Sequence, residues 1–412
     1  MRASKTTTGR RRSARGLVRG LLGAAALVIG LLIGAQPTSW AQGGTIKVGQ
    51  FLDLTGGGAS AAEAAKLATD VAISEINKAG GILGRKLVVV TADTQTDATV
   101  GVGEIKRLVL QEKVDVVFGP LISQVLMAAA PVLNDGKVPA FGSTGSELIT
   151  PKVAPYYFSV LINAEAQAQK VVREATEVLK AKSGAIISDD GAQAKSFVVS
   201  MKREMAARGM KLTGEQSYQY RATDMTPQLL ALKRGNPDTL FLFSSSGEDV
   251  GNTLKSLMEL NWGVKVTGNY TVATFAPAAL KIAGPAAFKN VTGTNYKAFN
   301  HCPGQPAPKV FLDFVALAKS FDGAKATRVS MPFASLFYEA VYLYKAAVEG
   351  AGGKTDGPSV AAWIEKNAKN FKFINEGLHP SETSHFLIGV DSLATVQPDK
   401  IEEGGIQLRT GC

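Results

Sequence analysis

The sequence predicts an α/β protein with two doubly wound parallel-sheet lobes that face a ligand cleft. Its 412 residues, 45% of them apolar, exceed the usual size of one domain and can fill two cores. Short apolar stretches alternate with longer amphipathic ones, which is the pattern of parallel strands joined by helical crossovers. This pattern starts at Ile46 and again after Tyr157-Phe158. Ligands bind at the carboxyl ends of the strands in such sheets, so the cleft between the lobes is the expected site.

Residues 1–41 are predicted to be a secretory signal peptide. Seven of the 45 Lys and Arg residues precede Leu21, an apolar stretch covers 21–33, and small residues stand at Ser39 and Ala41. The apolar stretch is shorter than the roughly 20 residues that span a bilayer. We therefore expect cleavage after Ala41 rather than an uncleaved anchor helix. No cysteine lies near that point, so we expect no lipid anchor and a mature chain in the periplasm.

The formal charge of +10 does not indicate nucleic-acid binding. Without the seven leader cations the excess of basic over acidic residues is about three, and no basic cluster follows residue 41. The two cysteines, Cys302 and Cys412, are candidates for a disulfide in an oxidising compartment. The sequence does not fix their geometry, so a bridge and two free thiols both stay open.

The first block of the chain is predicted to alternate between strands and helices. We expect strands at 46–51, 86–92, 114–118 and 138–141, and helices at 59–78, 99–112 and 123–133. The first helix has an apolar face through Leu67, Val71 and Ile76. It ends at Gly80-Gly81, a glycine pair typical of helix C-termini.

The second block has the same order of elements. We expect strands at 184–188, 211–217, 239–243, 264–268 and 290–294, and helices at 165–180, 196–208, 227–233 and 251–260. The remainder is mostly helical, at 310–321, 332–349 and 359–369, and short strands follow from Phe386. Two tandem blocks of this kind predict two sheets, each covered by helices.

The turn after the third strand is the first candidate ligand site. Gly119 and Pro120 turn the chain, and Leu121 leads to Ser123 at the start of the next helix. Free backbone N–H groups and the positive end of the helix dipole favour a carboxylate there, and the Ser123 hydroxyl adds one hydrogen bond. The alternative is that Ser123 only caps its own helix, as serine often does.

The turn after the fourth strand is the second candidate. Gly142, Ser143 and Thr144 follow that strand directly. Successive strands of a parallel sheet end on the same edge, so these residues are expected to face the same pocket as Ser123. The alternative is a short helix that Thr144 and Glu147 cap in a capping box.

The sequence shows no catalytic or metal-binding motif. His301, His379 and His385 form no H-x-x-x-H or H-E-x-x-H set. No nucleophile elbow, phosphate-binding loop or dinucleotide fingerprint is present. We therefore expect no metal, no cofactor and no enzymatic activity.

Several segments, in order along the chain, resemble one known family. They are residues 46–55, 75–87, 93–112, 119–123 and 143–148. The family is that of the periplasmic substrate-binding proteins of branched-chain-amino-acid-type ABC importers, the leucine/isoleucine/valine-binding proteins with the type I periplasmic binding fold. The similarity covers nearly all of the chain after residue 41 and is looser beyond about residue 160. It implies lobes formed by 42–161 with 297–381 and by 162–296 with 382–412, joined by three crossovers.

The resemblance implies roles for residues of the first lobe. The family's carboxylate-binding Ser and its partner Thr fall on Ser123 and Thr144. The backbone carbonyl that receives the ligand ammonium falls near Gly142 or Ser143. Leu121, in the turn before Ser123, is a further candidate ligand-binding residue.

The second lobe departs from the family's pattern. Residues 189–194 contain no counterpart of the family's Tyr-Gly pair, and Asn269 stands near the usual place of the acid that pairs with the ligand ammonium. The candidate ligand-binding residues of this lobe are Gln193, Ser246 and Tyr270.

The partner of a ligand ammonium therefore stays open. An unpaired buried cation is costly. Four acids in nearby turns offer compensation, although acids in such turns are more often solvated: Asp189, Asp190, Glu248 and Asp249. An aromatic or aliphatic acid that stacks on Tyr270 is the other interpretation.

The expected function is the extracytoplasmic solute-binding component of an ABC transporter. The chain would close as a monomer over a small carboxylate and deliver it to an inner-membrane permease. The ligand would be a branched-chain or other amino acid, or an aromatic or aliphatic acid. A ligand-sensing periplasmic receptor for a signalling partner is the near alternative, because the same fold serves both roles. A secreted hydrolase is the distant one, since no nucleophile–base pair is present.

Overall fold

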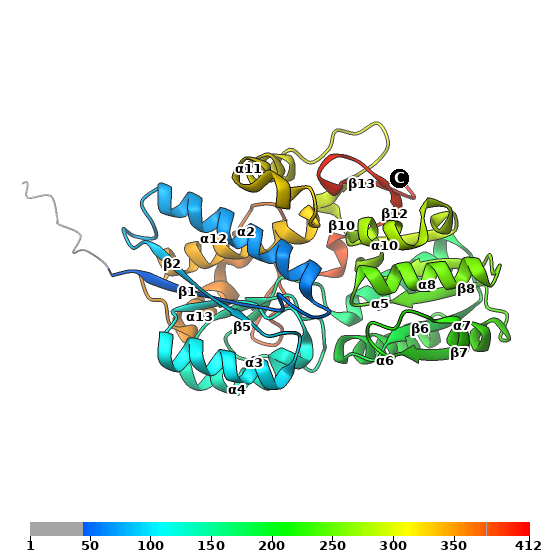
Figure 1. Cartoon of the computed structure of the whole chain (residues 1–412), viewed down its shortest axis with the longest axis horizontal. Helices are drawn as coiled ribbons and strands as arrows, with labels where there is room; N and C mark the ends of the chain where they lie inside the picture. The colour runs from blue at the N-terminus through cyan, green and yellow to red at the C-terminus, as the bar shows by residue number, and fades with distance from the viewer. Residues whose placement is uncertain (1–43, 376) are drawn as a thin grey trace, which may run out of the picture. The chain divides into compact units, whose positions relative to one another are not determined.

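The computed structural model describes residues 44–375 and 377–412. The predicted signal peptide and its cleavage point lie outside the described residues. The described chain folds into two α/β lobes, each built on its own sheet (Figure 1). The fold class predicted from the sequence is therefore confirmed.

The first lobe contains a sheet of five parallel strands. They are β1 (Ile46–Leu52), β2 (Leu87–Asp93), β3 (Val116–Phe118), β4 (Ala140–Gly142) and β5 (Tyr157–Ser159), in the order β2-β1-β3-β4-β5. The strands are connected by α2 (Ala59–Lys78), α3 (Ala98–Lys106) with a π-helical continuation (Arg107–Glu112), and α4 (Ser123–Gly136). The central strands β3 and β4 are buried along their whole length, as parallel strands covered on both faces are.

The second lobe contains an eight-stranded sheet. Its strands are β6 (Ser183–Asp189), β7 (Lys211–Tyr218), β8 (Thr239–Phe243), β9 (Lys265–Gly268), β10 (Val291–Tyr296), β11 (Asn300–His301), β12 (Leu393–Ile401) and β13 (Gln407–Arg409), in the order β11-β13-β12-β10-β9-β8-β6-β7. Its helices are α5 (Ala164–Arg173) with a continuation (Glu174–Val178), α6 (Ala192–Ala207), α7 (Thr226–Lys233), α8 (Gly247–Glu259), α9 (Tyr270–Thr274) and α10 (Ala276–Ala283). The strands from β6 to β10 pair in parallel, and β12 is antiparallel to β10.

Three later helices are α11 (Lys309–Ala326), α12 (Met331–Gly350) and α13 (Gly357–Asn367). Both α11 and α12 contact α2, so the chain returns to the first lobe after β11. It thus passes between the lobes after β5, before α11 and before β12. The exact lobe boundaries at residues 161, 296 and 381 stay a prediction. No helix within residues 44–375 and 377–412 is both long enough and apolar enough to cross a membrane.

The end of the chain is tied to the second lobe. A disulfide joins Cys302, which follows β11, to Cys412, and the two Cα atoms are 5.9 Å apart. Strands β11 and β13 pair in parallel next to it. The bond therefore fastens the last residue beside the segment that leads back to the first lobe.

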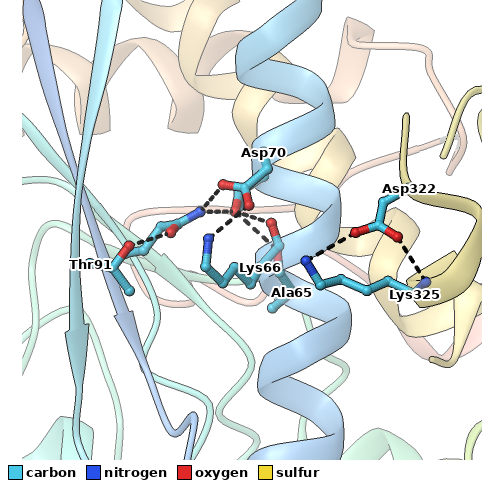
Figure 2. A network of polar contacts seen from close by, with 8 residues as sticks. Ala65, Lys66, Asp70, Thr91, Asp322 and Lys325 are labelled. Atoms are coloured by element: carbon cyan, nitrogen blue, oxygen red, sulfur yellow. Dashed lines mark hydrogen bonds and ion pairs between the residues drawn. The ribbon is translucent and has the colours of Figure 1, made fainter. Parts of the chain in front are cut away.

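A polar network holds α2 against the sheet of the first lobe. The fully buried Gln50 amide of β1 donates to Thr69 Oγ1 and to Asp70 Oδ1, both at 2.7 Å, and accepts from Thr91 Oγ1 of β2 at 2.8 Å. Asp70 also pairs with Lys66 at 2.8 Å. Figure 2 shows Asp70 and Lys66 on the helix opposite Thr91 on the strand. These directional bonds fix the helix, whose first turn reaches the site described below.

The structure differs from the sequence-based expectations in three places near that site. Helix α8 begins at Gly247 rather than at residue 251, because Ser246 caps it. Helix α6 begins at Ala192 rather than at Ser196, because Gly191 is its N-cap in an extended conformation. The segment 270–283, for which no element was predicted, forms α9 and α10. Its residues are mostly apolar or small, so it lacks the polar face by which a surface helix is recognised.

Candidate functional site

The two lobes enclose a cavity of about 260 Å³. Residues of the first lobe reach it from the segments after β1, β2, β3 and β4, and residues of the second lobe from those after β6, β7, β8 and β9. Both sheets thus present the carboxyl ends of their strands to the same space. This is the position that the fold class predicts for a ligand.

The turn after β3 is fixed by a buried carboxylate. Asp53, fully buried after β1, accepts from the Leu121 backbone N–H at 3.0 Å and from the Thr94 hydroxyl. Burial raises the pKa of Asp53, although both hydrogen bonds oppose the rise. Gly119 adopts φ = +118°, and a Cβ there would lie 1.8 Å from the Phe51 carbonyl oxygen. Only glycine fits this close approach of two backbone segments.

Ser123 lies in the cavity wall at the first residue of α4. It is 3% exposed, and its Oγ has no hydrogen-bond partner within the described part of the chain. The N-cap position belongs to Ile122, and no side chain caps the helix. The alternative that Ser123 only caps its own helix is therefore wrong. Its hydroxyl is a buried polar group that needs a partner.

The turn after β4 contributes less than expected. Ser143 lines the cavity, but Thr144 and Gly142 do not. The fully buried Thr144 donates from both its backbone N and its Oγ1 to the Tyr157 hydroxyl oxygen, at 3.1 and 2.9 Å. The Gly142 carbonyl accepts from the Val160 N–H at 2.8 Å. The structure thus places these two polar groups in contacts inside the first lobe.

The alternative of a capping box in this turn is also wrong. Residues 143–148 contain no helix. Glu147 Oε1 instead accepts from the Glu165 backbone N–H at 2.8 Å, at the start of α5. Thr144 and Glu147 therefore do not cap a common helix.

The predicted residues of the second lobe do lie in the cavity wall. Gln193, Ser246 and Tyr270 line it together with Leu121, Ser123 and Ser143 of the first lobe. Gln193 Nε2 is buried and has no partner among the residues described. Ser246 caps α8, with its Oγ accepting from the Asp249 N–H at 3.1 Å. Burial raises the pKa of Tyr270 to about 12, so this phenol is neutral.

Asp189 is one of the four acids for which both solvation and a role in the site stayed open, and it is not solvated. It is 1% exposed and lines the cavity at the end of β6. Its Oδ1 accepts from the Gly191 N–H at 2.9 Å and its Oδ2 from the Ser245 N–H at 2.7 Å. Burial raises the pKa of Asp189 to about 6. Asp249 is also buried, whereas Asp190 and Glu248 are exposed as expected.

Tyr220 was not among the residues predicted from the sequence. It lines the cavity just after β7, and its hydroxyl is buried without a partner in the described chain. The ring lies against Gly57 of the first lobe, where a Cβ would be 2.4 Å from a ring carbon. Its position after a predicted strand of a parallel sheet was the available signal. A second contact between the lobes joins the Ser146 and Ser196 hydroxyls at 3.0 Å.

Known proteins are similar to this chain in sequence. The family profile described as periplasmic binding protein matches residues 45–382. The Leu/Ile/Val-binding protein homolog 7 of Brucella suis is 28% identical over 233 residues, 54% of this chain and 57% of that protein. The chain thus matches little more than half the length of this relative. The Leu/Ile/Val-binding protein BraC3 of Rhizobium johnstonii is 25% identical over 323 residues, 78% of this chain and 83% of that protein.

Solved structures share the fold at lower sequence identity. The branched-chain amino acid transporter substrate-binding protein LivJ of Streptococcus pneumoniae, in complex with isoleucine, has a TM-score of 0.74 at 19% identity. The match covers 88% of this chain and 97% of that one. An ABC transporter solute-binding protein of Rhodopseudomonas palustris, in complex with 4-hydroxybenzoate, has a TM-score of 0.76 at 21% identity and covers 89% and 95%. Because the family profile spans well over half of the sequence, this chain belongs to the periplasmic binding protein family.

Proposed function

We propose that this chain is the solute-binding component of an ABC transporter, which binds a small carboxylate between its lobes and delivers it to an inner-membrane permease. The observation that carries the proposal is the Ser123 hydroxyl, which is buried in the interlobe cavity without a partner among the described residues. A buried polar group of this kind is stabilised when a ligand supplies the missing hydrogen bond.

The start of α4 suits a carboxylate. The first hydrogen bond within the helix runs from Leu126 N to Ile122 O, at 3.1 Å, so the backbone N–H groups before Leu126 have no intrahelical acceptor. The positive end of the helix dipole lies at the same place. The Ser123 hydroxyl and these N–H groups together would hold the two carboxylate oxygens.

Closure of the lobes would convert binding into a signal for the permease. Residues of both lobes line the cavity, so a bound ligand contacts both at once and favours the closed arrangement. The permease would recognise that arrangement. Relatives named for leucine, isoleucine and valine, and a fold neighbour bound to 4-hydroxybenzoate, support a ligand panel that contains both amino acids and aromatic acids.

Replacement of Ser123 by Ala is expected to weaken carboxylate binding about 10- to 100-fold, because the substitution removes one hydrogen bond to a charged group, worth about 1.5–3 kcal/mol. A thermal-shift screen of amino acids, short aliphatic acids and aromatic acids would first identify ligands. Calorimetry on the variant would then measure the loss. Ser359→Ala is the matched control, since Ser359 lies in the first turn of α13 and outside the cavity wall.

Two results would count against the proposed function. If no carboxylate in the panel raises the melting temperature of the wild-type protein, the chain is not a receptor for this class of ligand. If Ser123→Ala and Ser359→Ala bind equally well, the carboxylate does not lie at the start of α4.

A further inference from the structure

The charged side chains in the described wall of the interlobe cavity are all acidic. None of the described residues in its wall is Lys, Arg or His, whereas Asp97 and Asp189 both line it. Two further acids, Asp53 and Asp249, are buried close behind the wall. A low-dielectric site with carboxylates and no cation favours a ligand that brings positive charge.

The two lobes differ in what they offer at their helix N-termini. In the first lobe the N-terminus of α4 presents N–H groups and the unpartnered Ser123 hydroxyl. In the second lobe the N–H groups of Gly191 and Ser245, which precede α6 and α8, donate to Asp189 instead. The second lobe therefore fills its own anion site with a carboxylate of the protein. The cavity accepts negative charge on one side and presents it on the other.

The neighbours of Asp189 do not neutralise it. Five titratable groups interact electrostatically with Asp189. They lie in the turn after β6, at the end of β7 and just after it, on α8 and on α9: Asp190, Tyr218, Tyr220, Asp249 and Tyr270. All of these are acids or phenols. The side chain of Arg221, next to Tyr220, is exposed, and only its backbone N–H is bound in this cluster, to Asp249 at 3.0 Å.

We propose that Asp189 is the cation-binding residue of the second lobe and that it makes the cavity selective for a dipolar ligand. The ligand carboxylate lies at Ser123, and its positively charged nitrogen lies against Asp189. This inference rests on the proposed function, because it assumes the carboxylate at α4. Each Asp189 oxygen uses one acceptor site for a backbone N–H and keeps another for a ligand N–H.

The affinity for such a ligand is expected to fall as the pH is lowered. Burial raises the pKa of Asp189 to about 6 in the protein alone, and a bound cation favours the ionised carboxylate. Protonation below pH 6 therefore competes with the cation. The affinity for an amine-bearing ligand falls by up to about tenfold per pH unit from pH 6 downward. Between pH 6 and about pH 5 the affinity for the same carboxylate without its amine changes little, because such a carboxylate remains mostly ionised there.

The test compares paired ligands by calorimetry and thermal shift on the full chain. The pairs are leucine with 4-methylpentanoate and phenylalanine with 3-phenylpropanoate, which differ only by the amino group. We expect the wild-type protein to prefer the amine-bearing member. We expect Asp189→Asn to weaken that member at least tenfold, to change the deaminated acid less than threefold, and to remove the pH dependence. Asp190→Asn is the matched control, because Asp190 is the adjacent acid but is exposed and outside the wall of this cavity.

The outcomes distinguish a failure of this inference from a failure of the proposed function. If wild-type protein binds the deaminated acids as well as or better than the amino acids, the role of Asp189 is wrong and the proposed function stands. If Asp189→Asn weakens both members of a pair equally, the residue only supports the fold of the site. If Asp189→Asn does not fold, the wild-type preference and its loss toward pH 5 still decide the matter. If no ligand of either pair and no other carboxylate binds, both proposals fall.

Discussion

Replacement of Gly119 by Ala is expected to lower the free energy of unfolding by about 2–5 kcal/mol and to abolish tight ligand binding. The new Cβ would lie 1.8 Å from the Phe51 carbonyl oxygen, and the backbone has φ = +118°. A non-glycine residue in such a conformation costs about 1–3 kcal/mol, and forcing an atom into a packed interior costs a similar amount. The displaced turn carries Leu121 and Ser123, so the site is lost together with stability. Urea denaturation and calorimetry would measure the two effects.

The matched control for this substitution is Gly103→Ala. Gly103 is exposed within α3, and apart from its chain neighbours and the adjacent backbone of its own helix, no atom of the described chain lies within 4 Å of its ideal Cβ. Alanine favours a helix over glycine by about 1 kcal/mol, so this variant should be unchanged or slightly more stable. If Gly119→Ala were as stable as Gly103→Ala, the close contact between the turn and β1 would not exist in solution.

Loss of the Cys302–Cys412 disulfide is expected to lower the free energy of unfolding by about 2–5 kcal/mol. The two cysteines are 110 residues apart in sequence, so the bond closes a long loop and removes much conformational freedom from the unfolded chain. Urea denaturation of wild-type protein and of the Cys302→Ser/Cys412→Ser variant would measure the difference.

A reductant provides the control for the disulfide. It should bring the wild-type midpoint down to that of the double variant and leave the variant unchanged. A double variant as stable as the oxidised wild type would show that the disulfide does not stabilise the fold.

The sequence predicted the order of elements well because hydrophobic periodicity carries that information. Helix α2 and strand β8 begin and end at the predicted residues, since the helix is bounded by glycines and the strand is a short apolar run. The start of α6 was placed four residues late, because Asp-Asp-Gly-Ala is typical of a turn. Only the extended conformation of Gly191 shows that the turn ends there. Helices α9 and α10 were missed because their mostly apolar composition gives no amphipathic signal.

Residues of the site could be predicted from the sequence where their position just after a strand was enough to place them in the cavity wall. Ser123, Ser143, Gln193 and Tyr270 follow strand ends, and all of them line the cavity. Side-chain direction was not predictable in the same way. Thr144 also follows a strand end, yet its hydroxyl meets Tyr157, which lies 13 residues further along the chain. Such a contact depends on how β4 and β5 pair, which no local pattern records.

The burial of Asp189 also could not be predicted from the local sequence. Its two N–H donors come from Gly191, two residues away, and from Ser245, 56 residues away. The first contact is a local turn that the sequence suggests, while the second requires β6 and β8 to be neighbours. Acids in strand-end turns are usually solvated, so only the pairing of these strands shows that this one is enclosed.

The Gln50 network has a consequence for how the first lobe keeps its shape. The buried face of α2 is rich in alanine, through Ala62, Ala65, Ala68 and Ala72. Burial of apolar surface is non-directional, so it holds a helix to a sheet more strongly than it fixes the position of the helix along its axis. On the helix, the amide of Gln50 bonds to Thr69 and Asp70, and these directional contacts set the position of the helix along its axis. In this lobe, apolar packing holds the helix against the sheet, while polar side chains such as Gln50 and Asn77 fix where along the sheet it lies.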